Sequence, residues 1–260
     1  MTKTLKEKSS LGKILLAGLG LVAGTYFYST NKTQENKPVY TFQTLAQPIS
    51  FEEAKQDTSK RNKYLANLVE RIGKPEALRE ISYQPVLEGS LITGSRGAAM
   101  RTSFVGKDIA SKPIFDIIVA DKGFKSAWNE SDLISMLKDH EFKHISQYRG
   151  AFEVKMYAKK NEMVPAITKE FKRRIENTKD TLHLIFVELE AYLNQMRNFP
   201  EQSSDSLKIS TAVAYNAHVK LLNKQNSTPL IESLKYMYRE AILIRGLDGT
   251  ISDIVMKPLK

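Results

Sequence analysis

Two of the four histidines in this chain, His140 and His144, stand four residues apart in the stretch DHEFKHISQ, with Glu141 directly after the first. In a random chain with 4 histidines and 19 glutamates among 260 residues, this arrangement is expected on the order of 0.004 times, so the match carries information. On a helix, residues i and i+4 lie on the same face, where two imidazoles can bind one metal ion at about 2.1 Å each. Glu141 lies one step round the helix, beside that ion, where its carboxylate can take a proton from water. The spacing therefore predicts two metal ligands and one general base.

A catalytic zinc ion needs a third protein ligand, and the sequence contains no cysteine, so His, Glu or Asp must supply it. The stretch VELEAYLNQ contains two carboxylates, Glu188 and Glu190, in an otherwise apolar pattern, and a buried carboxylate needs a partner. The two lie about 200° apart on a helix, so only one can face the histidines. An ion pair with Lys179, Arg197 or the basic stretch KEFKRR is the alternative role for either glutamate.

Together, these stretches resemble the gluzincin-type zinc metallopeptidases, in which a His-Glu-x-x-His helix is followed tens of residues later by a helix with a ligand glutamate. HEFKHISQ matches the first element, including the glutamine three positions after the second histidine, and ELEAY resembles the Glu-x-x-Ala-Asp element. The resemblance covers about residues 139–197. It implies a zincin-like fold, a Zn²⁺ cofactor and hydrolysis of peptide bonds. It also favours Glu188 as the third ligand, because Glu188 precedes an alanine by three positions and that small residue would let the two helices approach closely.

Two positions differ from the family pattern. Lys143 places a charge where these motifs usually have an uncharged residue, and Tyr192 stands where an aspartate commonly supports a ligand histidine. A tyrosine hydroxyl can hydrogen-bond an imidazole, although it does not raise the basicity of that ligand as a carboxylate would. We therefore expect Tyr192 to support the site from one turn beyond Glu188.

A peptidase of this class also needs a hydrogen-bond donor for the oxyanion of the tetrahedral intermediate. We take His218, in the stretch VAYNAH, as that donor, and Tyr215, His183 and Tyr148 are the alternatives. An exposed sheet edge, for which we take PIFDIIVA at residues 113–120, would let an extended peptide substrate add as a further strand.

The elements before the motif follow from local signals. A helix is predicted from the capping box SFEE at Ser50 to the stop signals Gly73 and Pro75. Between Tyr83 and Phe124, β-rich runs separated by Gly, Asp and Lys-Pro predict a small three-stranded sheet. The runs are PVLEGSLITG, MRTSFVG and PIFDIIVA.

The motif itself lies on a helix predicted to begin at the N-cap Asn129 and to end at Gly150. Four apolar residues of this helix form one stripe that we expect to be buried: Leu133, Ile134, Leu137 and Ile145. The rest of the chain is predicted to be almost wholly helical, with a long apolar seam from Ile167 to Met196 and shorter helices near 206–223 and 229–243. Strands first and helices later indicate an α+β fold.

An apolar run of 18 residues, LGKILLAGLGLVAGTYFY, stands near the N-terminus with Lys13 as its only charge. As a helix it would be about 27 Å long, close to the hydrocarbon thickness of a bilayer. Lysines precede the run and aromatic residues close it, which predicts a signal anchor over residues 1–30 with the N-terminus in the cytoplasm. A polar tether over 31–49 and a metallopeptidase domain over 50–260, periplasmic or extracellular, would follow.

Two other interpretations of this N-terminal run stay open. A cleaved signal peptide would make the protein secreted, and a buried helix would leave it without any membrane element. The residues TYFYST after the apolar run contain no clear small-x-small cleavage site, which favours the anchor.

The net charge of +10 raises the question of an anionic partner, but residues 1–40 alone hold six lysines against two glutamates. The stretch KEFKRR has Phe171 between its charges and Ile175 four positions later, a pattern that indicates the solvated face of an amphipathic helix. No nucleic-acid partner is therefore expected. The hypothesis is a membrane-tethered zinc metallopeptidase that acts on a protein or peptide substrate. A catalytically silent zincin-like binding protein of the cell envelope, and a basic envelope or nucleic-acid-associated protein with an accidental motif, are the alternatives.

Overall fold

The computed structural model describes residues 48–87, 98–148, 164–175, 177 and 179–258. The chain divides into two units, Met1–Gln47 and Pro48–Lys260. The predicted signal anchor, and the tether up to Gln47, lie outside the described residues. Within the part of the chain that is described, no helix is both long enough and apolar enough to cross a membrane.

The second unit begins with two short helices and a turn. The capping box is present at α1 (Phe51–Gln56), where Ser50 Oγ accepts a hydrogen bond from Glu53 N and Glu53 Oε2 accepts one from Ser50 N. The predicted single helix is wrong in one respect, because Asp57 ends α1 and caps the 3₁₀ turn η2 (Thr58–Lys60) before α2 (Arg61–Ile72) begins. Gly73 ends α2 at φ 90°, a left-handed conformation that favours glycine.

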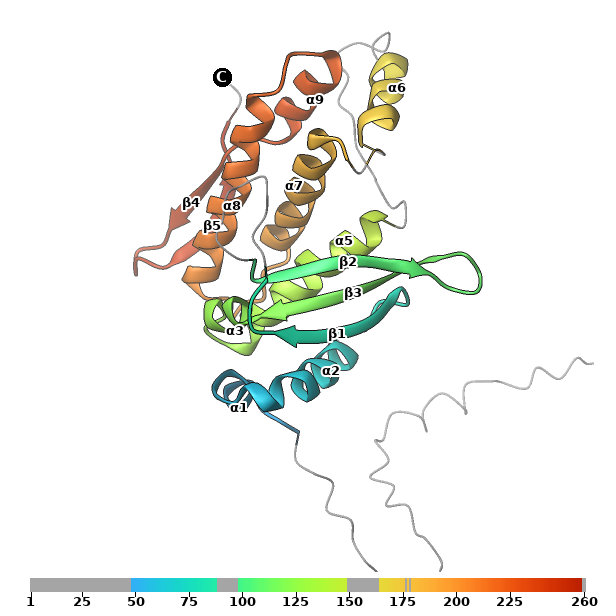
Figure 1. The fold of residues 1–260 in the computed structure, drawn as a ribbon. Helices are drawn as coiled ribbons and strands as arrows, with labels where there is room; N and C mark the ends of the chain where they lie inside the picture. The colour runs from blue at the N-terminus through green and yellow to red at the C-terminus, as the bar shows by residue number, and fades with distance from the viewer. Residues whose placement is uncertain (1–47, 88–97, 149–163, 176, 178, 259–260) are drawn as a thin grey trace, which may run out of the picture. The chain divides into compact units, whose positions relative to one another are not determined.

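A small mixed sheet follows, with β1 (Leu78–Gln84), β2 (Met100–Lys107) and β3 (Pro113–Ala120) in the order β1-β3-β2 (Figure 1). β1 runs parallel and β2 antiparallel to β3. The predicted α+β class is confirmed. The expectation that β3 forms an edge is wrong, because pairing on both sides places it at the centre, where Phe115, Ile117 and Val119 are buried.

β1 lies earlier in the chain than its predicted run PVLEGSLITG, most of which lies outside the described residues. The register of β1 against β3 shifts between Leu78 and Glu80, so the buried Leu78 and Ile81 stand three positions apart instead of two or four. This irregularity removes the period-2 alternation by which a strand is recognised.

The motif helix has three segments after the short α3 (Asp121–Ser126): α4 (Glu130–Ile134), η3 (Ser135–Glu141) and α5 (Phe142–Tyr148). Asn129 caps α4 as predicted, accepting a hydrogen bond from Asp132 N at 2.9 Å. The middle segment, η3, is a π-helix and not the predicted α-helix, and it contains His140 and Glu141. π-helical turns of this kind are rare and occur frequently at functional sites.

One hydrophobic core joins these elements. Leu65 and Leu68 of α2 and Leu137 of η3 belong to the same buried cluster as the sheet residues Phe115 and Ile117. The helices α1 and α2 lie on one side of the sheet, with α5 and the C-terminal helices on the other (Figure 1). Each such buried side chain contributes roughly 1.5–3 kcal/mol to folding.

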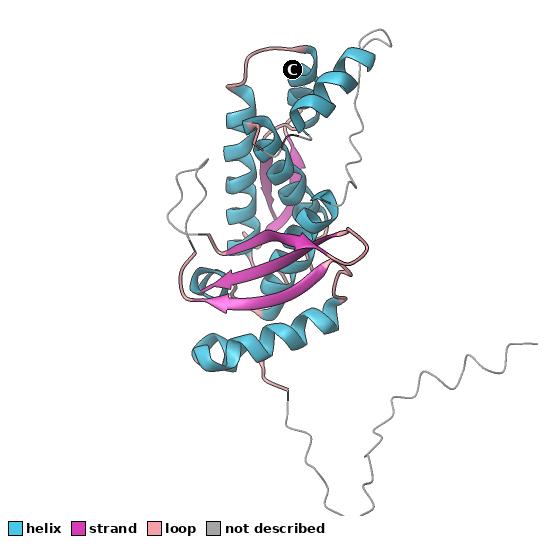
Figure 2. Cartoon of the chain, turned by 45° about the vertical axis from the view of Figure 1, so that its right-hand side comes forward, coloured by secondary structure: helices cyan, strands magenta, loops and turns pink. Residues whose placement is uncertain are grey.

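The C-terminal part is helical as far as Met237: α6 (Val164–Ile175), α7 (Thr181–Arg197), α8 (Asp205–Asn223) and α9 (Pro229–Met237). The predicted long seam is divided between α6 and α7, because Asp180 caps a new helix by accepting from Leu182 N. The prediction of helix up to residue 243 is wrong. β4 (Ala241–Arg245) and β5 (Ile251–Met256) form a hairpin there, separate from the three-stranded sheet (Figure 2).

Candidate metal centre

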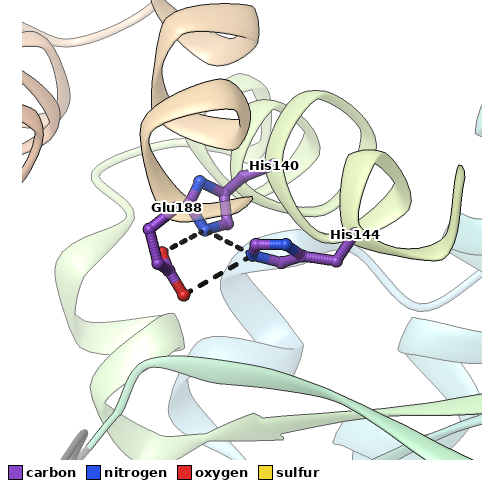
Figure 3. A group of neighbouring side chains, drawn as sticks. All are labelled: His140, His144 and Glu188. Atoms are coloured by element: carbon purple, nitrogen blue, oxygen red, sulfur yellow. Dashed lines mark hydrogen bonds and ion pairs between the residues drawn. The ribbon is translucent and has the colours of Figure 1, made fainter. Parts of the chain in front are cut away.

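Two imidazoles from the motif helix and one carboxylate from α7 converge on one point (Figure 3). The Nε2 atoms of His140, in η3, and His144, in α5, lie 3.2 Å apart. Glu188, in α7, has one carboxylate oxygen 3.5 Å from His140 Nε2 and the other 3.7 Å from His144 Nε2. Both histidines are buried, whereas the side chain of Glu188 is 33% exposed, so the group is open to solvent at Glu188.

These separations fit one bound zinc ion. Ligand atoms about 2.1 Å from a tetrahedral zinc ion lie about 3.4 Å from one another, and the three observed distances fall close to this value. Nitrogen lone pairs and a carboxylate this close repel one another unless a proton or a cation lies between them. Two imidazoles and one carboxylate are also a ligand set that leaves a fourth tetrahedral position open. The residues present therefore fit a metal ion such as zinc, held by three protein ligands with one position left open.

The proton on His144 can be assigned from its neighbour Gln147, whose side chain is buried. The Nε2 atom of Gln147 donates to the backbone oxygen of Val187 at 2.9 Å. Gln147 therefore presents its oxygen to His144, and Nδ1 of His144 donates to that oxygen at 2.9 Å. In the neutral imidazole, Nε2 of His144 then carries a lone pair directed toward Glu188, as metal binding requires.

The electrostatics of the group favour a negatively charged Glu188 beside a positively charged His140. Burial acts to raise the pKa of Glu188, but the hydrogen bond from His140 and the charges of His144, His140 and His218 outweigh it and lower this pKa to about 2. Burial likewise acts to lower the pKa of His140, and Glu188, assisted by Glu141, reverses this effect, so the pKa of His140 is raised. The carboxylate is therefore ionised at neutral pH, even without a metal ion.

Glu190, two residues after Glu188, has different partners. The hydroxyl of Tyr238 donates a hydrogen bond to one oxygen of Glu190, and Nζ of Lys143 lies 3.9 Å from the other. Of the two glutamates, the structure thus brings the favoured one, Glu188, to the histidines. Lys143, one of the two departures from the family pattern, lies beside the glutamate that the histidines do not contact.

A hydrogen bond from a strand of the sheet orients the carboxylate of Glu141. Thr102 of β2 donates a hydrogen bond to Glu141 Oε2 at 2.7 Å, and its hydroxyl also lies 3.3 Å from the backbone oxygen of Glu141. β2 is an edge of the three-stranded sheet, so one side of this strand is unpaired within the described residues. Sequence reasoning missed Thr102, because a threonine in a strand carries no local signal for a partner 39 residues away.

Tyr192 contacts the group through its ring. Its centroid lies 4.4 Å from that of His140 and 5.6 Å from that of His218. Among the described residues, no hydrogen bond joins Tyr192 to a ligand imidazole, because Nδ1 of His140 is buried without a partner and Nδ1 of His144 is bonded to Gln147. The Tyr192 ring is tilted by 52° to the imidazole of His140, so Tyr192, one turn after Glu188, contacts the site through the packing of two inclined rings.

His218, in α8, lies beside Tyr192 and is buried. Its Nδ1 donates to the backbone oxygen of Ala214 at 2.9 Å, so Nε2 can donate to a substrate oxygen only when the imidazole is protonated. The charge of His218 acts on Glu188, which brings it within electrostatic reach of the centre.

The alternative oxyanion donors differ in position. Tyr215 is fully buried in the C-terminal core, and His183 is bonded to the backbone oxygen of Ile175. Tyr148 is half-exposed, and its pKa is raised by burial and by the charges of Glu188 and Glu141. Tyr148 is therefore close enough to the centre for the charges of Glu188 and Glu141 to act on its hydroxyl. Tyr215 and His183 are buried in the core instead.

No family model, no curated protein and no solved structure matches this chain. The class of site is therefore defined by its own geometry: a His-His-Glu group on two helices, with a further glutamate and a strand threonine beside it.

If this group binds zinc and hydrolyses peptides, replacing Thr102 by valine is expected to lower the turnover about 10- to 100-fold and to keep the bound metal. Valine keeps the shape and strand preference of threonine but removes the donor to Glu141, and a hydrogen bond to a charged group contributes about 1.5–3 kcal/mol. Thr102→Ser keeps a hydroxyl and should retain most of the turnover. Equal turnover in the valine and serine variants, with wild-type zinc content, would show that this bond does not serve the reaction.

Proposed function

We propose that this chain is a zinc-dependent metallopeptidase of the gluzincin type, with a zincin-like fold, that hydrolyses peptide bonds in a protein or peptide substrate. The observation that carries the proposal is the convergence of His140, His144 and Glu188 at tetrahedral spacing, with the carboxylate of Glu141 on the adjoining residue. A group that only stabilises a fold does not need two buried imidazole nitrogens that face a carboxylate open to solvent.

Each residue has a role in this proposal. When bound, zinc supplies Lewis acidity, which polarises a carbonyl oxygen and makes water acidic near neutral pH. Glu141, oriented by Thr102, accepts a proton from the attacking water and returns it to the leaving amine. Protonated His218 donates to the developing oxyanion. The unpaired edge of β2 accepts the substrate as an added strand beside Glu141.

The test is the metal content and activity of the folded unit, residues 48–260. We expect one zinc ion per chain, and cleavage of casein or of a peptide library that stops on chelation and returns with zinc. Stoichiometric zinc without cleavage of any peptide would instead indicate the catalytically silent binding protein. A protein that binds no divalent metal would overturn both proposals and leave the motif as an accident.

We further propose that residues 1–30 anchor the protein in a membrane and that the peptidase acts outside the cytoplasm. The support is the apolar run with lysines before it and aromatic residues after it. A reporter enzyme fused after residue 45 is expected to be active outside the cytoplasm and to stay with the membrane fraction after a salt wash. Release into the soluble fraction at a lower mass would contradict the anchor and support a cleaved signal peptide.

A further inference from the structure

Polar contacts join the two helical elements that carry the proposed ligands, at intervals of about one turn. Nδ2 of Asn194 donates to the backbone oxygen of Asp139 at 2.7 Å. Nε2 of Gln147 donates to the backbone oxygen of Val187 at 2.9 Å. Because the lower number on one element pairs with the higher number on the other, the elements run in opposite directions. The pair of Lys143 and Glu190, 3.9 Å apart, lies between the two amides.

The two amide contacts are reciprocal. Gln147 reaches from the histidine helix to the carbonyl directly before Glu188, and Asn194 reaches from the glutamate helix to the carbonyl directly before His140. A bond to a backbone carbonyl fixes the main chain and not a movable side chain. Each amide therefore fixes, from the opposite helix, the main-chain position from which one ligand extends.

The amide of Gln147 makes a second contact, because its oxygen accepts a hydrogen bond from Nδ1 of His144 and so keeps the proton on that nitrogen. Its orientation is determined by Val187, because a carbonyl can only accept. One side chain thus sets the separation of the two helices and the tautomer of a ligand. Gln147 is 1% exposed, so no water can replace either bond without rearrangement.

We propose that Gln147 and Asn194 form a reciprocal amide clamp, which positions the two helices so that His140, His144 and Glu188 meet at metal-binding distance. Neither amide touches the metal or the substrate; both are positioning residues. The proposal rests on the proposed metal site. Residues that orient metal ligands typically contribute 10- to 100-fold to metal affinity.

Each variant in the test removes one amide at similar volume. Gln147→Met is expected to lower zinc affinity 10- to 100-fold and to mix the two tautomers of His144. Asn194→Leu is expected to lower the affinity by a similar factor and to leave the tautomer unchanged, because Asn194 does not contact His144. Asn194 is only half-buried, so this variant is expected to fold even where Gln147→Met does not.

The control is Asn216→Leu. The side-chain amide of Asn216 also forms two part-buried hydrogen bonds, with the backbone of Ala241 at 2.9 Å and 2.7 Å. These bonds join α8 to β4 and not the two helices of the proposed metal site. This variant should lower the unfolding temperature and leave zinc affinity within about 2-fold of wild type, since it orients no ligand.

Zinc affinity is measured by competition with a chromophoric chelator, ligand geometry by the visible spectrum of the cobalt(II) form, and the tautomer by nitrogen NMR of the metal-free protein. Wild-type affinity and spectrum in Asn194→Leu, or an equal loss of affinity in Asn216→Leu, would overturn the clamp. If the wild type binds no zinc or cobalt, the proposed function fails. Even then, the metal-free Gln147→Met variant tests whether Gln147 keeps the proton of His144 on Nδ1. An unchanged tautomer would show that it does not.

Discussion

Glu141→Gln is expected to retain the fold and the bound zinc while lowering the turnover of a peptide substrate by about 10²–10⁴-fold. The amide has nearly the same shape as the carboxylate and can still accept the hydrogen bond from Thr102, which is 2.7 Å from Glu141 Oε2 in the structure. It cannot accept a proton from water, and it cannot return one to the leaving amine. The loss is therefore expected in kcat, with little change in zinc affinity.

The measurement is turnover together with metal content, and Glu232→Gln provides the control. Glu232 is an exposed glutamate of α9 whose partners are Ser227 and Lys235, so its amide variant should behave as wild type. If Glu141→Gln kept wild-type turnover, proton transfer would not pass through this residue. The proposed mechanism would then be wrong, even if zinc were bound.

Glu188→Ala and Glu190→Ala are expected to have opposite effects on metal and on stability. Glu188 lies 3.5 Å from His140 Nε2 and 3.7 Å from His144 Nε2, so its removal should lower zinc affinity by several orders of magnitude. The metal-free variant is expected to remain folded, because its two helices are also joined by Gln147 and Asn194.

Glu190→Ala should keep its zinc and lose stability. Tyr238 is 2% exposed and donates its hydroxyl to Glu190, so this variant leaves a buried donor without an acceptor, at about 1–3 kcal/mol. The pair of variants is compared by zinc content after mild chelation and by the unfolding temperature without metal. If Glu190→Ala lost zinc and Glu188→Ala kept it, the third ligand would be Glu190 and not Glu188. The proposed class of enzyme would be unaffected by this result.

The features that could be predicted from the sequence alone are those set by residues close together in the chain. His140, Glu141 and His144 stand within five consecutive residues, so their common location could be read directly from the sequence. The capping residue Ser50 and the N-cap Asn129 act within three positions of themselves, and both were predicted correctly. The strands β2 and β3 show regular runs of β-forming residues and were found for the same reason.

Some local signals were present but misread. The sequence between β4 and β5 contains Asp248-Gly249, a hairpin signal, and Gly249 has φ 81°. The helical pattern that precedes it extended the predicted helix past Met237 instead. At β1 the irregular register against β3 hides the alternation, so no local pattern there identifies a strand.

Tertiary structure determined the side-chain contacts between segments that are distant in the sequence. Glu188 and Glu190 carry the same charge two positions apart, and only the packing of α7 against η3 and α5 directs Glu188 to the histidines and Glu190 to Tyr238. Thr102 reaches Glu141, and Asn194 reaches Asp139, because a strand and a helix fold beside the motif. Helical periodicity is a property of the backbone within one segment, whereas these contacts depend on how side chains of separate segments fill one core. The sequence therefore located the proposed histidine ligands and the proposed base, whereas the fold determined which glutamate lies beside the histidines and which residues contact the group.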